Sequence, residues 1–267
     1  MRRARLLSVS LIAIILLVAS SSIYADEVTQ NIQSIILDNF FEPQQHEWIV
    51  TGSNFVTQGY PQSAMVKTWP DALYRQPPQG TDIRSLGIHA KFDRMGYNYI
   101  EITPATKDAN GQLVPTPIDI PGRMKSLDVW MWGSYRNYYV EAQLQDYRGI
   151  VHVLRLGSLD YRGWEDLTVG VPSSIPQSVT YIPSTKGLKL LKFVIWSTPN
   201  TPVDDFYTYI NQIKVITDTF ESPWDGETLA NPSYVDKLWS AAGVSGPAGT
   251  QANQGTQSAQ SGTAQGK

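Results

Sequence analysis

The segment LDVWMWGSYRNYYVEAQLQDYRGIVHVLRLGSLDYRGWEDLTVGVPSSIPQSVTYIP, residues 127–183, decides the fold class of this chain. In YYVEAQLQ, residues 138–145, every second residue is apolar and the others are mostly polar. This period of two is typical of a strand with one buried and one solvated face. In LDVWMW, residues 127–132, large side chains occupy both faces, which predicts a strand that is central or covered by a partner.

The rest of the chain continues this pattern of short strands and turns. Proline-rich segments at 69–84 and 104–121 predict loops, and Asn110-Gly111 predicts a tight turn. Series of short strands joined by Gly and Pro turns are typical of sandwiches and barrels. The chain is therefore predicted to be all-β, with a jelly-roll-like β-sandwich of about ten strands. Besides the strands in 127–132 and 138–145, we expect strands at residues 35–37, 48–56, 63–68, 86–92, 97–103, 150–156, 167–171, 190–196 and 206–216.

One short helix is predicted near the C-terminus. Asn231 is a suitable N-cap, Pro232 suits the first helical position, and the apolar residues after them recur at helical spacing. From residue 243 the composition is reduced almost entirely to small and polar residues, which cannot bury enough apolar surface to offset their ordering entropy. We therefore expect a single β-sandwich domain at 26–242 and a low-complexity, disordered tail at 243–267.

The N-terminus predicts export. Arg2, Arg3 and Arg5 form a basic region, residues 6–19 form an apolar region, and a small-residue stretch at 20–25 leads to a plausible cleavage site before Asp26. Removal of this signal peptide, residues 1–25, leaves 18 basic and 24 acidic residues and a formal net charge of −6. This acidity, without a basic stripe, argues against a nucleic-acid partner. No later segment predicts a membrane span, and the absence of cysteine excludes a disulfide scaffold.

The sequence contains no recognisable catalytic motif. Nucleophile elbows, phosphate-binding loops and dinucleotide fingerprints are absent, and His46, His89 and His152 lack metal-ligand spacing. We therefore do not expect an enzyme. A pair of carboxylates for glycoside hydrolysis could still form in space, although the candidates fall mostly on predicted wet faces or turns. These candidates are Glu141, Asp146, Glu165 and Asp166.

Acidic residues near the two ends of the domain suggest one metal site. Asp38 and Glu42 flank the first predicted strand, and Asp218 follows the last one. In a jelly roll these ends often lie side by side, and carboxylate oxygens suit calcium. The three residues are therefore candidate ligands of a structural calcium ion, against the alternative of ordinary turn and cap roles. No other cofactor is predicted.

Aromatic residues are the most informative surface feature, with 8 Trp, 14 Tyr and 7 Phe in the chain. Many must fill the core of a sandwich, but exposed rings could anchor a protein interface or stack on sugars. The sequence does not separate these two uses. Our interface candidates are Trp130, Trp132, Tyr135, Tyr139, Tyr147, Tyr161 and Trp164.

Several segments carry a family resemblance. SLDVWMWGSYRNYYVEAQLQDYRGIVHVLRLGSLDYRGW, followed by VPSSIPQSVTYIP, resembles the signature block of the spirochaete periplasmic flagellar filament outer layer (sheath) proteins, the FlaA family. FYTYINQIKV, residues 206–215, is similar to the penultimate strand of that family, and residues 225–239 are similar to its C-terminal segment. The resemblance covers approximately residues 35–239 and leaves out the polar tail.

The resemblance implies a structural, non-enzymatic subunit of the periplasmic flagellum. Such a subunit would assemble in repeated copies on a core of flagellin proteins, beside other sheath or coat proteins. It would contribute to filament stiffness, curvature and cell motility. The residues alone leave two alternatives open: a secreted carbohydrate-binding jelly-roll module, and a periplasmic hydrolase with two close carboxylates.

Overall fold

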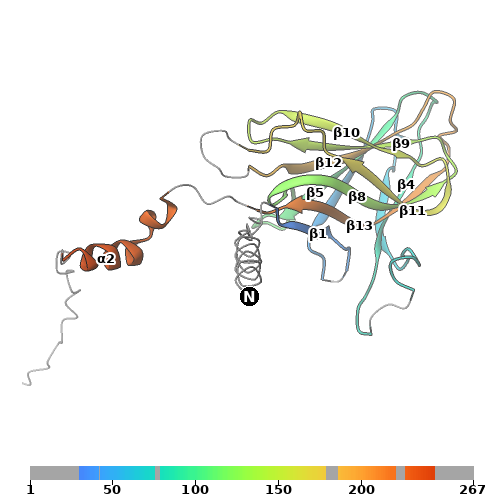
Figure 1. The fold of residues 1–267 in the computed structure, drawn as a ribbon. Coiled ribbons are helices and arrows are strands. Elements are labelled where there is room, and N and C mark those ends of the chain that lie inside the picture. Colours follow the sequence, from blue (N-terminus) through green and yellow to red (C-terminus); the bar gives the residue numbers. More distant parts are fainter. Residues whose placement is uncertain (1–29, 42, 76–78, 179–185, 221–225, 244–267) are drawn as a thin grey trace, which may run out of the picture. The chain divides into compact units, whose positions relative to one another are not determined.

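The computed structural model describes residues 30–41, 43–75, 79–178, 186–220 and 226–243 (Figure 1). The predicted signal peptide, the calcium candidate Glu42 and nearly all of the predicted tail lie outside these residues. The chain divides into two compact units, Met1–Ser222 and Pro223–Lys267. The first contains the sandwich and the second contains the helix.

The second unit begins its described part with a 3-10 helix, η1 (Glu227–Ala230), followed by α2 (Pro232–Ala241). Asn231 is the N-cap of α2, and its side-chain oxygen accepts a hydrogen bond from the Ser233 backbone N–H at 3.1 Å. The predicted helix is therefore confirmed, with the predicted cap. No residue of α2 is buried.

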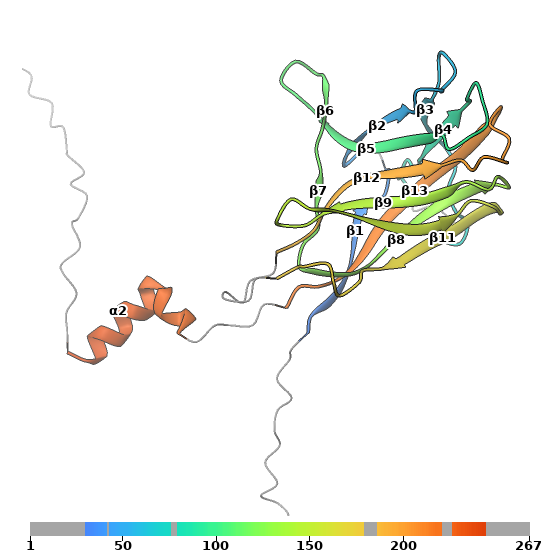
Figure 2. The same ribbon diagram turned by 90° about the horizontal axis from the view of Figure 1, so that it is seen from above.

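The sandwich consists of two antiparallel sheets (Figures 1 and 2). The first, which we call sheet 1, has the strand order β11 (Arg162–Gly170), β8 (Arg123–Ser134), β13 (Phe206–Asp218), β4 (Ser85–Ala90) and β3 (Gln62–Val66), and β1 (Ile32–Asp38) also pairs with β13. Sheet 2 has the order β10 (Val151–Ser158), β9 (Tyr139–Gln145), β12 (Lys189–Trp196), β5 (Tyr99–Lys107) and β2 (Glu47–Gly52); β6 (Leu113–Pro115) pairs with β5, and β7 (Ile118–Asp119) with β12. The predicted all-β sandwich is confirmed.

The proline-rich segment 104–121 departs from the prediction. It was expected to be a loop, but it contains the end of β5 and the short strands β6 and β7. Proline cannot donate to a ladder and is tolerated only where no donor is required. Pro104 meets this condition because the ladder between β12 and β5 ends at Ile102, before Pro104 is reached.

The core lies between the inner faces of the two sheets, because every second side chain of a strand points to the inner face. Leu127, Val129 and Met131 enter it from β8, and Val140 and Leu144 enter from β9, all with no exposed area. These residues are the apolar positions of the two alternating patterns in the central segment. The same alternation sends the other half of each strand to the outer faces, which are therefore the places to search for function.

A β-bulge in β13 controls what its outer face carries. The ladder with β8 shifts register between Asn211 and Ile213, and the extra residue, Gln212, has a φ of 25°. A bulge inserts one residue, so the alternation restarts after it. Gln212 is held there because its Nε2 donates to the Tyr74 hydroxyl at 3.1 Å. The bulge keeps Tyr207, Tyr209 and Asn211 on the outer face and still directs Ile213 to the core.

Candidate binding surfaces

The outer face of sheet 1 carries a continuous row of residues across five strands. Trp164 in β11 is opposite Trp132 in β8, and Trp132 is opposite Tyr209 in β13. Tyr209 is opposite Gly87 in β4, and Gly87 is opposite Ala64 in β3. We call these five residues the sheet 1 row. It consists of large rings that end in two small residues.

The rings of the sheet 1 row contact one another. Trp132 meets Tyr209 edge to face, with ring centroids 5.5 Å apart, and Trp164 is tilted against Tyr209 at 6.4 Å. Offset and edge-to-face pairs of this kind are favourable for aromatic rings. Among the described residues, neither indole N–H of this row has a hydrogen-bond partner, so the row is held by ring packing rather than by polar contacts.

The small end of the sheet 1 row is hollow. A groove of about 330 Å³ lies over it. A Cβ atom placed on Gly87 would be 3.2 Å from the ring of Tyr209 and 3.3 Å from Val66, so the missing side chain helps to keep the floor open. The lining residues are Gln62, Ser63, Ala64, Val66, Gly87, Ile88, His89, Tyr207 and Tyr209.

His89 forms one wall of this groove and is fixed on three sides. Its ring stacks on Tyr207 with centroids 3.9 Å apart and meets Tyr60 edge-on at 4.9 Å. Its Nε2 lies 2.9 Å from an oxygen of Asp205. Because a carboxylate can only accept, Nε2 carries the proton of this bond. The other ring nitrogen, Nδ1, has no hydrogen-bond partner within the described part of the chain.

Two carboxylates lie on the same outer face, near Trp130. Asp128 is almost completely buried, and its Oδ1 is 3.2 Å from Lys214 Nζ on β13. Burial raises the pKa of Asp128, and the nearby charge of Asp166 raises it further, whereas Lys214 lowers it. Burial also raises the pKa of Asp166. One lysine therefore faces two acids, and this cluster of three residues keeps an excess of negative charge.

Sheet 2 also carries an aromatic row on its outer face, but polar contacts hold this one in place. Tyr99, Trp196 and Tyr139 are consecutive cross-strand neighbours on β5, β12 and β9, with centroid distances of 5.0 and 6.4 Å. The indole N–H of Trp196 donates to Glu141 Oε2 at 2.9 Å. The guanidinium of Arg155 lies 4.3 Å from the centroid of the Tyr139 ring. We call Tyr99, Trp196 and Tyr139 the sheet 2 row.

The turn between β9 and β10 is organised by Asp146. Its Oδ1 accepts hydrogen bonds from the backbone N–H groups of Arg148 and Ile150 at 2.9 and 3.0 Å. Its Oδ2 is 2.9 Å from His152 Nε2. The His152 bond and the two backbone bonds hold the pKa of Asp146 below its usual range. This hydrolase candidate therefore serves as a turn residue, and Glu141 is engaged by Trp196.

The free edge of sheet 2 exposes apolar side chains. Among the described strands, β10 pairs only with β9, and Val151 and Val153 are 45% and 52% exposed. Ile150, just before the strand, is 51% exposed, and Tyr147 in the turn is 38% exposed. We call Tyr147, Ile150, Val151 and Val153 the β10 edge. An exposed apolar edge strand is a template for pairing with another chain.

The structure separates our seven interface candidates. Trp130, Trp132 and Trp164 lie together on sheet 1, whereas Tyr139 and Tyr147 belong to sheet 2 and its turn. Tyr135 is 63% exposed after β8. Tyr161 is packed against Gly133, and its hydroxyl donates to the Met131 carbonyl at 3.0 Å. Burial raises the pKa of this hydroxyl well above its usual value.

Sequence reasoning missed four aromatic residues of these faces. They were placed in predicted strands, but the partners of those strands were unknown. Only the cross-strand register shows that they extend the rows begun by Trp132 and Tyr139. Two signals were available in the sequence. One was the alternation in FYTY, and the other was the aromatic residue at the start of β5 and at the end of β12. The missed residues are Tyr207, Tyr209, Tyr99 and Trp196.

The calcium candidates Asp38 and Asp218 do not come together. β1 and β13 do pair, as expected for the two ends of the domain, but Asp218 is opposite Ile32 and Asp38 is opposite Ile213. The two acids thus lie at opposite ends of one ladder, ~20 Å apart at the rise of a strand. The antiparallel register is the reason. The third candidate, Glu42, lies outside the described residues.

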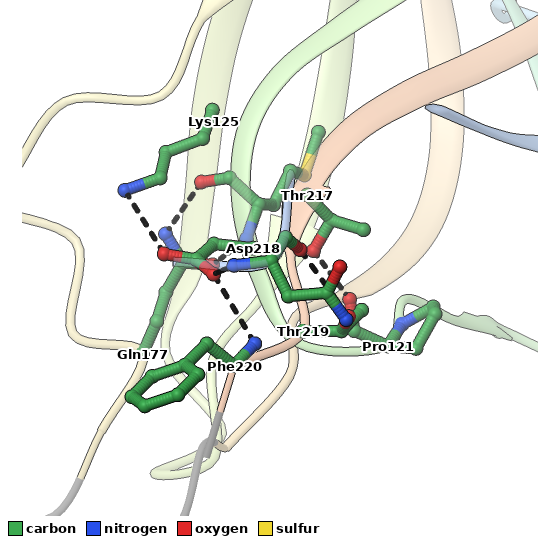
Figure 3. Close-up of polar contacts among 9 residues, drawn as sticks. Pro121, Lys125, Gln177, Thr217, Asp218, Thr219 and Phe220 are labelled. Carbon is green, nitrogen blue, oxygen red and sulfur yellow. Dashed lines mark hydrogen bonds and ion pairs between the residues drawn. The ribbon is translucent and has the colours of Figure 1, made fainter. Parts of the chain in front are cut away.

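Each of these two acids is already used by the protein. Asp218 Oδ1 accepts from the backbone N–H groups of Asn31 and Phe220 at 2.9 and 3.1 Å (Figure 3), which lowers its pKa. Asp38 accepts from the Phe40 N–H at 2.8 Å and from Trp48 Nε1 at 2.9 Å. Within the described ranges, no three His, Asp or Glu side chains form a group that could hold a metal ion. None of the helices in these ranges has the length and hydrophobicity of a membrane span.

Comparison with solved structures finds β-sandwiches of low similarity to this chain. It aligns with TmCBM61 in complex with β-1,4-galactotriose at 12% identity and a TM-score of 0.36, over 66% of this chain and 88% of that one. It aligns with a family 11 carbohydrate-binding module of a Clostridium thermocellum cellulosomal cellulase at 10% identity and a TM-score of 0.39, over 70% and 96%.

Sequence comparison identifies the family. The family model of FlaA, the flagellar filament outer layer protein, matches residues 17–222. A flagellar filament outer layer-like protein of Brachyspira hyodysenteriae is 26% identical over 135 residues, which are 51% of this chain and 58% of that protein. The match thus spans less than two thirds of the relative. The chain belongs to the FlaA family of flagellar filament outer layer proteins, and the resemblance seen in its central segment is confirmed.

Proposed function

We propose that this protein is a structural subunit of the outer layer of the periplasmic flagellar filament. Repeated copies would coat the flagellin core, beside other sheath proteins, and contribute to filament stiffness, curvature and cell motility. Family membership over residues 17–222 is the observation that supports this proposal most. The role is one of assembly rather than catalysis. Repetition along a filament allows a small contact per subunit to be multiplied by avidity.

The β10 edge is the contact surface that we propose for assembly. It presents apolar side chains on a strand whose outer backbone groups are unpaired by the other described strands. Proteins commonly protect such edges with charges or coverage. The other edge on the same side of the sandwich, β11, is protected in this way, because Glu165, Asp166 and Thr168 are exposed along it. On β10 the exposed charge, Arg155, comes after Val151 and Val153, so the apolar start of the strand is the part that we propose a neighbouring subunit covers.

Val153→Lys tests the contact surface. The side chain is exposed, so the protein should fold and be exported, while a charge at the centre of the edge opposes pairing. We expect at least a roughly tenfold lower recovery with purified filaments, the loss typical of a disrupted central contact. The matched control is Thr168→Lys, an exposed position on β11, which should leave recovery unchanged.

Two results would count against these proposals in different ways. Equal recovery of Val153→Lys and the wild type would remove the β10 edge as the contact. Absence of the wild-type protein from isolated filaments, tested with a specific antibody, would remove the outer-layer role itself. Cells that lack the protein should retain core filaments but change filament shape and swimming.

A further inference from the structure

We propose that the groove over Gly87 binds a pyranose ring of an uncharged glycan chain. The groove lies on sheet 1, at the small end of the sheet 1 row, and is separate from the β10 edge of sheet 2. The inference therefore goes beyond the outer-layer role and does not depend on it. It follows from the shape of the groove, its ring-bearing walls, its unused polar groups and its charge.

The shape of the groove is that of a small-molecule site. Its volume of about 330 Å³ is at the lower end of the range for ligand pockets, which suits one or two sugar rings of an open chain. The hollow exists because Gly87 and Ala64 stand where the row would otherwise continue with larger side chains. Trp132 and Trp164 extend from the hollow across β8 and β11, so a longer chain has further rings to follow.

The walls present aromatic surface to the hollow. Tyr209 leans over Gly87 from one side, and Tyr207 stands beside it on the same strand. Tyr207 is 38% exposed although it stacks on His89, so part of its ring area is available to a ligand. Tyrosine supplies large and rigid contact area at low conformational cost, and the C–H face of a pyranose is the apolar surface that such a ring can cover.

Polar groups with unused hydrogen-bonding capacity surround these rings. Asp205 holds His89 through Nε2, so that Nδ1 is left at the wall without a partner in the described residues. The side chains of Gln62 and Ser63 also lack a partner there. A site for a purely apolar side chain would not need such groups. A sugar, whose hydroxyls ring an apolar face, would use both the walls and the polar rim.

The charge of the groove decides between classes of sugar. No Lys, Arg, Asp or Glu is among its lining residues, and His89 already has a carboxylate partner. An acidic sugar would bury its charge without compensation, which is costly. A peptide strand would instead seek the free edge of β3, outside the hollow, because β4 and β13 are paired on both sides. An uncharged glycan fits both facts.

The test is a titration of the purified, exported protein with a panel of neutral β-linked tetrasaccharides of glucose, N-acetylglucosamine, galactose, mannose and xylose. Calorimetry and tryptophan fluorescence would report binding, because Trp132 and Trp164 contact Tyr209, which lines the groove. We expect saturable binding of at least one member. Tyr207→Ala should weaken it about tenfold or more, as for a central aromatic contact.

Two further variants guard against loss of structure. Gln62→Ala changes an exposed side chain at a sheet edge and should weaken binding without affecting folding. Tyr139→Ala removes a ring of the sheet 2 row and should leave binding unchanged. Absence of saturable binding across the panel would overturn the inference, and so would an equal loss in Tyr139→Ala. Binding of p-cresol, the analogue of a tyrosine side chain, without binding of any sugar would also overturn it. The groove would then be a pocket for a protein side chain.

Discussion

The two outer faces of this sandwich each carry an aromatic row, but the rows are held differently. In the sheet 2 row, Trp196 donates to Glu141, and Arg155 covers Tyr139. In the sheet 1 row, Trp132 and Trp164 contact Tyr209 through their rings and have no hydrogen-bond partner for their N–H groups among the described residues. The indole N–H of the sheet 2 row is satisfied by a carboxylate, whereas the two indole N–H groups of the sheet 1 row are left available.

This difference suggests how to separate structural rings from functional rings on a β-sandwich. Exposure alone does not separate them, because the indoles of both rows are half-buried. Spare hydrogen-bonding capacity and a hollow floor separate the two kinds of ring. Packed polar groups normally have a hydrogen-bond partner within the protein, and those without one can be satisfied by a ligand. By this criterion the sheet 1 face is prepared for a ligand, whereas sheet 2 offers only its uncovered edge strand.

The largest effect that we expect is a complete separation of the two faces by paired variants. Tyr207→Ala should lose most glycan binding and keep its recovery with filaments. Val153→Lys should lose recovery with filaments and keep glycan binding. Each loss should be about tenfold or more. The measurements are calorimetric titration and filament co-sedimentation on the same preparations. If both variants fail in both assays, the two faces do not act independently and the comparison is lost.

The sequence could predict the faces but not their composition. Alternation in YYVEAQLQ identified its core positions correctly, because the period of a strand is a local property. LDVWMW predicted a central or covered strand, and β8 is central in sheet 1. The grouping of Trp164, Trp132 and Tyr209 depends on the order and register of strands far apart in the chain. The bulge at Gln212 adds a shift that no local pattern reveals. A site built across strands is therefore less predictable than the strands themselves.

The next effect concerns the hairpin that carries the β10 edge. Asp146→Asn should lower the Tm more than any other variant of the remaining predictions, because the charged acceptor of three hydrogen bonds is replaced by a neutral one. The pKa of Asp146 is lowered, so its stabilisation is present above the unfolded pKa, about 4, and is lost as the pH falls through the folded value.

Thermal unfolding of Asp146→Asn and the wild type from pH 7 to pH 3 measures this effect. The difference in Tm should be greatest near neutral pH. It should shrink as the pH falls below about 4 toward the lowered pKa of the folded carboxyl, because the unfolded carboxyl takes up a proton first. Asp160→Asn, in an exposed turn, is the control and should change little at either pH. A difference in Tm that does not vary with pH would show that the charge of Asp146 is not what stabilises the turn.

A smaller effect measures the polar contact of the sheet 2 row directly. Trp196→Phe keeps an aromatic ring but removes the N–H that donates to Glu141, so it should cost ~1 kcal/mol more in free energy of unfolding than Trp132→Phe, which loses no hydrogen bond. Urea unfolding gives both values. Adding Glu141→Ala to Trp196→Phe should cost little more, because the pair is already broken. Equal losses in the two Phe variants would show that the rows are held alike.

The smallest effect concerns the excess negative charge of the cluster formed by Asp128, Asp166 and Lys214 on sheet 1. Burial and mutual repulsion raise the pKa of Asp128, and burial raises that of Asp166, while Lys214 can satisfy only one of them well. A carboxyl with a raised folded pKa binds more protons when folded, so it lowers stability as the pH rises through the window above its usual pKa. Asp166→Asn should therefore raise the free energy of unfolding by ~0.5 kcal/mol at pH 7, the scale of a surface charge pair, and by nothing below about pH 4.

Urea unfolding of Asp166→Asn and the wild type at both pH values measures this effect, with Asp160→Asn as the control. A loss of stability at pH 7 would mean that Lys214 holds both acids, and that this face carries no electrostatic penalty from the pair.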